Sequence, residues 1–203
     1  MKKIIDISDW QDGISFDAIK SAGFDGVIFK LAEGCSPSAC WKQYMKAAES
    51  AGLPYGVYIY ARALDADGAK REAVNALQLC KDAGMTTTLG IWYDIEDPTI
   101  VGENGGAGIG SAQITANASA FISKCNANGV YVGIYAPWWV IRDRINTGEL
   151  AAYVPYWVSY AASNGGNPLA GSSLKCAGWQ YAIDGTNGET VEGYRVDVSE
   201  WYV

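Results

Sequence analysis

The sequence predicts one α/β domain, a modified TIM-type barrel that spans residues 1–203. Three observations favour this fold. The length suits a single domain with a sizeable core. Strand and helix patterns alternate over the first two thirds, which implies a parallel sheet with right-handed crossovers. Eight strand patterns in so short a chain leave too few residues for every outer helix, and we expect the missing helices in the C-terminal third.

The first strand pattern, residues 4–8, carries an acid within an apolar run. Ile5 and Ile7 share one face, while Ile4, Asp6 and Ser8 share the other. An acid in such a strand needs a partner or a function.

The remaining strands and the helices follow from the same periodicities. Helices are closed by glycines at 23, 52 and 84, as is common at helix C-termini. Further strands are expected at 26–34, 55–62, 89–96, 130–135, 154–160, 177–182 and 194–198, and helices at 16–22, 38–51, 65–83 and 111–128.

The fourth strand, residues 89–96, ends in acids. Trp92, Asp94 and Glu96 share one face, so two carboxyls point the same way with Cα atoms about 6.6–6.8 Å apart. Such a pair should raise the pKa of one carboxyl. A protonated acid beside an ionised one suits cleavage of a glycosidic bond. A solvated strand end with three acids is the alternative.

Residues 101–110 form a glycine-rich stretch without a phosphate-binding motif, which we expect to be a flexible rim of the cleft. Ser111 is expected to cap the following helix. Later, about sixteen and eleven residues separate the last three strands, and Asp184-Gly185 and Asn187-Gly188 are turn signals. Because a parallel crossover needs a dozen or more residues, the last strands should pair through loops or a hairpin.

Composition excludes several functions. A net charge of −7 argues against nucleic acid or an anionic membrane as a partner. The absence of histidine removes Ser-His-Asp and Cys-His catalysis and the usual zinc sites. No apolar run is long enough to span a membrane, and Asp6 interrupts the N-terminal apolar run, so no signal peptide is expected. The five cysteines lack metal spacing, and reduced thiols are favoured over a Cys35–Cys40 bridge.

The polar residues on the strand faces opposite the aliphatic side chains form a candidate site. Catalytic groups in such barrels come from the ends of several strands at one mouth. The acids are Asp6, Asp94, Glu96 and Asp197, and other strands bring Tyr60, Tyr135, Trp157 and Gln180.

Several motifs, in order, resemble one family along the whole chain. They resemble those of the lysozymes of glycoside hydrolase family 25, the N-acetylmuramidases of phage endolysins and bacterial autolysins. The matching segments are Asp6-Ile7-Ser8-Asp9-Trp10-Gln11, Lys30-Leu31-Ala32-Glu33-Gly34, Asp94-Ile95-Glu96, Pro155–Tyr160, Gly178–Tyr181 and Val196-Asp197-Val198.

The resemblance implies a flattened barrel of eight strands and about five helices. It implies cleavage of the β-1,4 bond between N-acetylmuramic acid and N-acetylglucosamine in bacterial peptidoglycan. Glu96 would be the general acid, Asp94 would stabilise the transition state, and Asp6 and Asp197 would complete the acidic cleft. We expect substrate contacts from Glu33, Tyr60, Tyr135, Trp157 and Gln180, a monomer that acts outside the cell at the bacterial wall, and no metal or cofactor.

Three alternatives remain from the sequence. A chitinase-like barrel also ends a strand in Asp-x-Glu, although Gly90 and Trp92 stand where aspartates are usual. A non-catalytic glycan-binding barrel commonly lacks the catalytic acid, which is present here as Glu96. A phosphodiesterase would use the carboxylates to hold Mg²⁺ or Ca²⁺.

Overall fold

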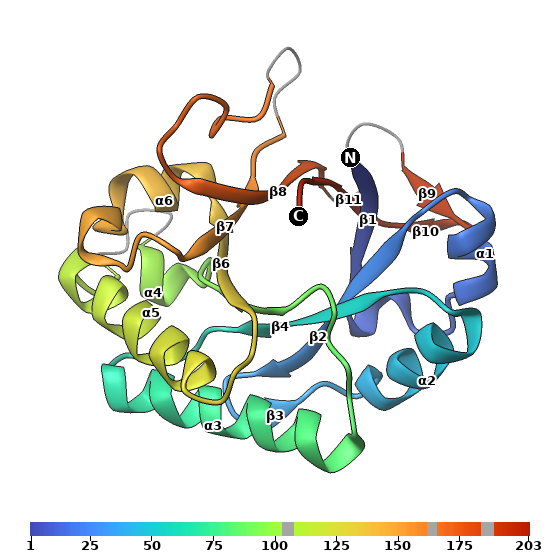
Figure 1. The fold of residues 1–203 in the computed structure, drawn as a ribbon, viewed down its shortest axis with the longest axis horizontal. Coiled ribbons are helices and arrows are strands. Elements are labelled where there is room, and N and C mark those ends of the chain that lie inside the picture. Colours follow the sequence, from blue (N-terminus) through green and yellow to red (C-terminus); the bar gives the residue numbers. More distant parts are fainter. Residues whose placement is uncertain (103–107, 162–165, 184–188) are drawn as a thin grey trace.

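In the computed structural model, which describes residues 1–102, 108–161, 166–183 and 189–203, eight strands close into a barrel. Seven neighbouring strands are parallel, and β11 closes the barrel by pairing antiparallel with both β1 and β8. The predicted α/β barrel is therefore confirmed (Figure 1). The strands are β1 (Lys2–Ile7), β2 (Gly26–Glu33), β4 (Tyr55–Tyr60), β5 (Ile91–Asp94), β6 (Val132–Pro137), β7 (Pro155–Ser159), β8 (Lys175–Ala182) and β11 (Asp197–Trp201).

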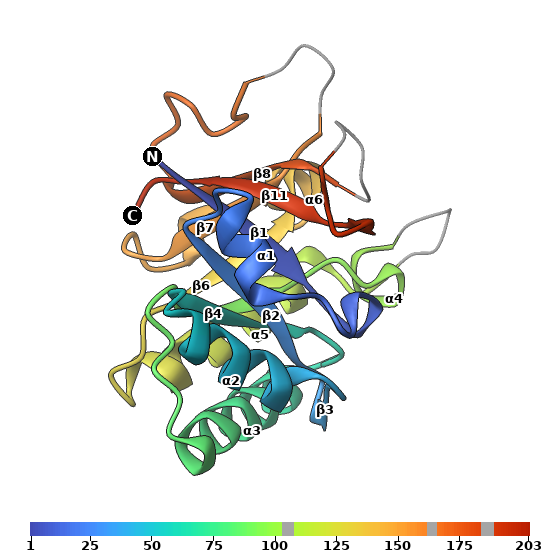
Figure 2. The same ribbon diagram turned by 90° about the vertical axis from the view of Figure 1, so that its right-hand side faces the viewer.

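Helices lie on the outside of the barrel, and α2 and α3 lie next to one another over one side of it (Figures 1 and 2). Helix α3 also packs along α5. The α-helices are α1 (Phe16–Ser21), α2 (Trp41–Ala51), α3 (Ala66–Ala83), α4 (Pro98–Val101), α5 (Ser111–Asn126) and α6 (Trp138–Asp143). Short elements are the 3-10 turns η1 (Asp9–Gln11) and η2 (Thr147–Glu149), β3 (Ser36–Pro37), and the β9–β10 ribbon (Thr190–Val191 and Tyr194–Arg195).

The outer helices are lost where the sequence predicted. Within the described part of the chain after Asp143, no α-helix follows a strand. Strands β7 and β8 are nevertheless parallel, and their connection includes residues 166–174, which run as turns and irregular backbone. Strand β11 then returns antiparallel to β8. An antiparallel partner needs no crossover helix, which is how a short chain closes the barrel.

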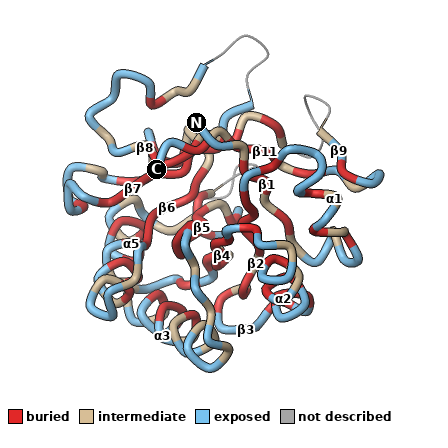
Figure 3. The backbone as a smooth tube through the Cα atoms, turned by 45° about the vertical axis from the view of Figure 1, so that its right-hand side comes forward, coloured by how far each residue is buried: buried red, intermediate tan, exposed pale blue. Residues whose placement is uncertain are grey.

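Burial follows the barrel, with buried backbone in the strands and exposed segments at the periphery (Figure 3). One apolar cluster fills the space between the barrel and its helices, and a second fills the barrel interior. The inner cluster consists of Ile4, Ile28, Leu89, Trp92, Tyr135, Trp157, Ala177 and Trp201.

Three tryptophans form the floor of the barrel interior. Trp92, Trp157 and Trp201 meet edge to face, with ring centroids 5.2 to 5.9 Å apart. Gly133 and Gly178 make room for them, since a Cβ on either residue would lie 2.3 Å from an indole carbon. This rigid layer supports the polar residues nearer the mouth.

Some expected boundaries were wrong. Helix α2 begins at Trp41 rather than residue 38, because residues 36–37 pair with β2 while Ser38 and the Cys40 amide bind the Asp9 carboxylate. Ser111 does not cap α5: the N-cap is Gly110, and no side chain bonds to the helix end there.

Three strands also differ from their expected bounds. The fourth strand ends at Asp94, so Glu96 lies just beyond it, although the Ile95 amide still donates to the Tyr135 carbonyl. The fifth strand is shifted to 132–137 and leads directly into α6, which the sequence did not predict. The last strand is shifted to 197–201, because Tyr194 and Arg195 pair with β9 instead.

Other expectations fall partly outside the described residues. Residues 103–107 of the expected rim and the turn signals at 184–188 are not described. All five cysteines are free, with Cys40 and Cys125 buried and Cys35 exposed. None of the helices in the described ranges has the length and apolar character needed to cross a bilayer.

Candidate active site

The four predicted acids come together at one end of the barrel. Parallel strands place the carboxyl ends of β1 and β5 at the same mouth, which brings Asp6 near Asp94 and Glu96. Strand β11 runs the opposite way, so its first residue, Asp197, lies at this end too and is paired with Asp6 in the register. Their side chains therefore neighbour one another.

Asp94 is the buried member of the set, with 3% of its surface exposed. Its Oδ1 has no hydrogen-bond partner among the described residues. Burial raises the pKa of Asp94 well above its usual value, and the nearby carboxyls of Glu96 and Asp6 raise it further. Lys30 opposes the shift but does not cancel it. The Asp94–Glu96 pair therefore retains a proton above the usual titration range of a carboxyl.

Gln180 links three strands beneath the acids. Its Nε2 donates to both carboxylate oxygens of Asp6, at 3.1 and 3.0 Å, and lies 3.5 Å from Asp197 Oδ2. Its Oε1 accepts from Tyr135 Oη at 2.9 Å. With 1% of its surface exposed, Gln180 is a fixed donor that holds Asp6 in place.

Tyr58 lies among all four acids. Burial raises the pKa of its phenol, and the charges of Asp94, Asp6, Glu96 and Asp197 raise it further. A phenol that stays protonated beside carboxylates can donate a hydrogen bond to them or to a substrate. The pKa of Tyr135 is raised in the same way, first by burial and then by the charges of Glu96, Asp94 and Asp6.

Two hollows flank the acids and meet at Asp197. The Glu96 hollow, of about 630 Å³, is lined by Glu96, Tyr135, Pro137, Trp138, Trp139, Arg142, Ser159, Tyr160, Ala161, Ile183 and Asp197. The Asp6 hollow, of about 410 Å³, is lined by Asp6, Ile7, Ser8, Trp10, Gln11, Tyr58, Arg195 and Asp197. Together they provide an extended site with carboxyls at its centre.

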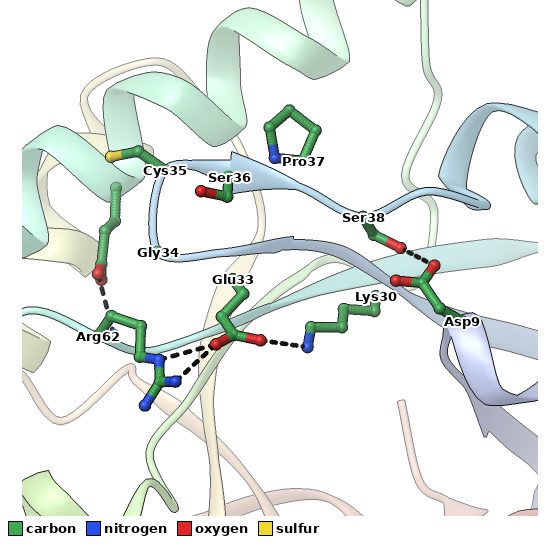
Figure 4. Close-up of a pocket in the computed structure, with 10 residues that line it drawn as sticks. Asp9, Lys30, Glu33, Gly34, Cys35, Ser36, Pro37, Ser38 and Arg62 are labelled. Atoms are coloured by element: carbon green, nitrogen blue, oxygen red, sulfur yellow. Dashed lines mark hydrogen bonds and ion pairs between the residues drawn. The ribbon is translucent and has the colours of Figure 1, made fainter.

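Glu33 lies in a separate pocket of about 480 Å³ beside the mouth (Figure 4). Its carboxylate is paired with Lys30 Nζ at 3.0 Å and with Arg62 Nη2 at 2.7 Å. The hydrogen bond from Lys30 lowers the pKa of Glu33, and Arg62 adds to this effect. Arg62 also pairs with Asp97, which ties Glu33 to the segment after Glu96. The sequence-based expectation that Glu33 contacts substrate stays a prediction.

The predicted aromatic residues lie at different depths. Trp157 is 1% exposed and donates through Nε1 to Ser199 Oγ at 2.9 Å, so here it supports the floor of the site. Tyr60 is nearer the surface, with Lys30 Nζ 5.1 Å and Arg62 Cζ 5.5 Å from its ring centroid. Their roles in binding remain predictions.

The sequence analysis missed four neighbours of the site: Tyr58, Lys30, Arg62 and Ser159. Tyr58 was detectable, because it shares a strand face with Tyr60. Ser159 bonds with Tyr135 and lines the Glu96 hollow. Arg62 follows the strand face that carries Tyr58 and Tyr60, but its partners Glu33 and Asp97 come from other parts of the chain. Lys30 pairs with Glu33 of its own strand, three residues away.

The acid cluster suits proton transfer. In the described ranges, no three His, Cys, Asp or Glu side chains are placed to hold a metal ion. One buried carboxyl, one partly exposed carboxyl and an adjoining hollow are the elements that general acid catalysis of sugar hydrolysis requires.

Comparison with known proteins identifies the family of the chain. The family model for glycosyl hydrolases family 25 matches residues 5–190. The chain belongs to this family. The autolytic lysozyme of Clostridium acetobutylicum is 26% identical over 186 residues, which cover 91% of this chain and 51% of that protein. The resemblance noted from the motifs is thus confirmed.

Solved structures of family members share the fold. The modular autolysin LytC of Streptococcus pneumoniae aligns with a TM-score of 0.81 and 27% identity, over 99% of this chain and 46% of that one. A bacterial lysozyme from Streptomyces coelicolor aligns with a TM-score of 0.75 and 25% identity, over 98% of this chain and 91% of that one. The family 25 chain spans about half the length of the curated relative and of the autolysin.

Proposed function

We propose that the protein is a lysozyme, an N-acetylmuramidase that hydrolyses the β-1,4 bond between N-acetylmuramic acid and N-acetylglucosamine in bacterial peptidoglycan. The observation that carries the proposal is the pairing of buried Asp94 with Glu96, which opens onto a hollow at the barrel mouth, in a chain of family 25. Relatives named as lysozymes and autolysins support the substrate class.

Glu96 is the proton donor in this proposal. The pair retains a proton because burial and like charges raise the pKa of Asp94. Asp94 is 3% exposed, whereas Glu96 lines the hollow, so the proton reaches a leaving oxygen through Glu96. Asp94 then carries negative charge while positive charge develops on the sugar.

The substrate itself supplies the nucleophile. N-acetylmuramic acid carries a 2-acetamido group whose carbonyl oxygen attacks the anomeric carbon as Glu96 protonates the leaving oxygen. The bond to the leaving sugar breaks, and an oxazolinium ion forms. Such an intramolecular attack has an effective molarity of up to about 10⁵–10⁸ M when well oriented. In this proposal the acetamide N–H donates to Asp94 Oδ1, an atom for which the described residues supply no partner. Glu96 then takes a proton from water, which opens the ring with net retention.

The other predicted residues orient and bind. Asp6 and Asp197 complete the acidic cleft, and Gln180 fixes Asp6. Tyr60, Tyr135, Trp157 and Glu33 shape or contact the glycan site. Proton transfer and charge stabilisation suffice for this reaction, so the proposal includes no metal or cofactor. We further propose that residues 1–203 act as one catalytic domain, as a monomer, at the bacterial cell wall outside the cell.

The test is digestion of purified peptidoglycan, followed by identification of the new reducing end. N-acetylmuramic acid at that end is the expected result. N-acetylglucosamine there, or turnover of chitin in place of peptidoglycan, contradicts the proposal and favours a different glycosidase.

Glu96→Gln tests the assignment of the acid. Glutamine keeps the shape but cannot donate the proton, and general acid catalysis contributes about 10²–10⁴-fold. We expect a loss in kcat of that size with an unchanged melting profile. Retained activity in Glu96→Gln, with activity lost in Asp94→Asn, would reverse the two roles.

A further inference from the structure

Trp10 is the most exposed large hydrophobic side chain among the described residues, at 89%. It contrasts with Trp92, Trp157 and Trp201, which are at most 1% exposed inside the barrel. Trp10 lies at the mouth and lines the Asp6 hollow. Apolar surface in water is unfavourable, and contact with a ligand would remove part of the indole from water, so an exposed indole that lines a hollow is suited to binding.

The turn that carries Trp10 is held firmly. Ser8 Oγ accepts from the Trp10 amide at 3.3 Å, while Gln11 Oε1 accepts from the Ser8 amide at 2.9 Å, which forms a capping box. Gln11 Nε2 donates to the Arg195 carbonyl at 3.1 Å. The adjacent Asp9 carboxylate accepts from the Cys40 amide at 3.0 Å. The indole is therefore presented by a fixed backbone.

The chain after the turn is fixed as well. Tyr194 Oη donates to the Asp12 carbonyl at 2.8 Å. A Cβ on Gly13, whose φ is +88°, would lie 3.2 Å from that hydroxyl. The ribbon of β9 and β10 thus braces the turn from the far end of the sequence.

The surroundings of Trp10 favour a sugar over a protein partner. Asp9, Asp12 and Gly13 beside it are exposed, and Gln11 is partly exposed, so the indole is a single aromatic surface within polar residues. Docking sites for proteins are usually larger apolar patches. A pyranose matches this site better, because its C–H face packs on an aromatic ring while its hydroxyls meet polar side chains.

We propose that Trp10 is an aromatic platform for a further pyranose ring of the glycan, bound in the Asp6 hollow. Asp197 lines both hollows, so a glycan that passes Glu96 continues past Asp197 onto Trp10. Ser8, Gln11 and Arg195 bring polar groups to the same hollow. The platform deepens the proposed lysozyme function and rests on it for the identity of the glycan.

The experiment measures binding and turnover separately. Binding uses the inactive Glu96→Gln protein with and without Trp10→Ala, titrated with N-acetylmuramic acid–N-acetylglucosamine oligosaccharides of increasing length. We expect Trp10→Ala to weaken binding of the longer oligosaccharides about 3- to 10-fold, as loss of one aromatic contact implies. In the protein that keeps Glu96, Trp10→Ala should raise KM, and this increase should grow with glycan length.

Trp10→Tyr and Tyr153→Ala are the matched variants. Tyrosine at position 10 keeps a ring and should recover most of the lost affinity. Tyr153 is also exposed, at 59%, but lines neither hollow, so Tyr153→Ala should leave binding unchanged. Unchanged glycan binding in Trp10→Ala, or an equal loss at every length, overturns the platform.

The outcomes separate this inference from the proposed function. A native protein that binds the oligosaccharides through Trp10 but cleaves none refutes the lysozyme function and leaves the platform. A native protein that cleaves peptidoglycan, with Trp10→Ala binding as tightly, refutes the platform alone.

Discussion

Two buried aspartates three residues apart should respond in opposite ways to the same substitution. Burial raises the pKa of Asp94, and the like charges of Glu96 and Asp6 raise it further. Burial also acts to raise the pKa of Asp97, but hydrogen bonds from Thr99 and the charge of Arg62 outweigh it and lower the pKa. Asparagine keeps the shape of both side chains and removes only the charge.

Asp94→Asn should stabilise the protein at neutral pH while abolishing most activity. Two like charges about 7 Å apart, which is the Cα spacing of residues i and i+2 in a strand, repel by about 2 kcal/mol at an effective dielectric constant of about 20. Since the pair retains a proton for part of the time, we expect a gain of about 1–2 kcal/mol at pH 7. For a domain of this size, that raises Tm by about 2–8 °C.

The pH dependence of unfolding shows whether ionised Asp94 destabilises the fold. A raised folded-state pKa means that wild-type stability is lost as pH rises above the ordinary value of 3.8 and through the raised value. The advantage of Asp94→Asn should therefore be absent in acid and grow towards neutral pH. Thermal unfolding between pH 3.5 and 8 measures it. A lower Tm for Asp94→Asn at pH 7, or a difference that does not grow with pH, would refute the reasoning.

Asp97→Asn is the matched control with the opposite sign. Because folding lowers the pKa of Asp97, its carboxylate stabilises the folded protein at pH values above the ordinary pKa of 3.8. This stability is lost as the pH falls through the lowered pKa. Asparagine still caps α4, but the ion pair with Arg62 is lost. Because Arg62 is half-exposed, we expect a loss of only about 1–2 kcal/mol at pH 7 that vanishes in acid.

Three further predictions concern the core and the chemistry. Gly133→Ala should cost about 1–3 kcal/mol or more in urea unfolding, because its Cβ would meet Trp92, whereas Gly148→Ala, with nothing within 4 Å, should cost far less; equal effects would contradict the packing argument. Activity should persist in EDTA, and a loss restored by Mg²⁺ would favour phosphodiesterase chemistry. NMR should show the β-anomer as the first product; an initial α-anomer ends the retaining mechanism, and an ester trapped on Asp94 by mass spectrometry ends substrate assistance.

The alternation of side chains along single strands was readable from the sequence. It correctly grouped Trp92 with Asp94 on one face and Ile91, Tyr93 and Ile95 on the other. The structure shows that Trp92 belongs to the inner cluster and the other three to the outer one, while Asp94 lies beside Asp6 and Glu96. It also indicated that acids on separate strands meet at one mouth, since parallel strands end at the same edge of a sheet. The alternation is a property of a single strand, so it can be read without knowing which strands pair with it.

Boundaries near the mouth were less readable because distant residues decide them. Helix α2 starts late, since Asp9 binds the Ser38 hydroxyl and the Cys40 amide. The last strand starts late, since Tyr194 and Arg195 pair with β9. Neither contact produces a periodic pattern in the sequence of the segments that it joins.

By itself the sequence determined the barrel, the order of its strands, the faces that carry the acids and the family. The tertiary structure alone decided depth and proximity. It placed Tyr58 among four acids, Trp157 in the floor, Glu33 in an adjoining pocket and Trp10 out in solvent at the mouth. Alternation tells which face a side chain is on, but not how far along the barrel axis its neighbours lie. That depends on the register between strands, which long-range packing and the closing antiparallel strand β11 set.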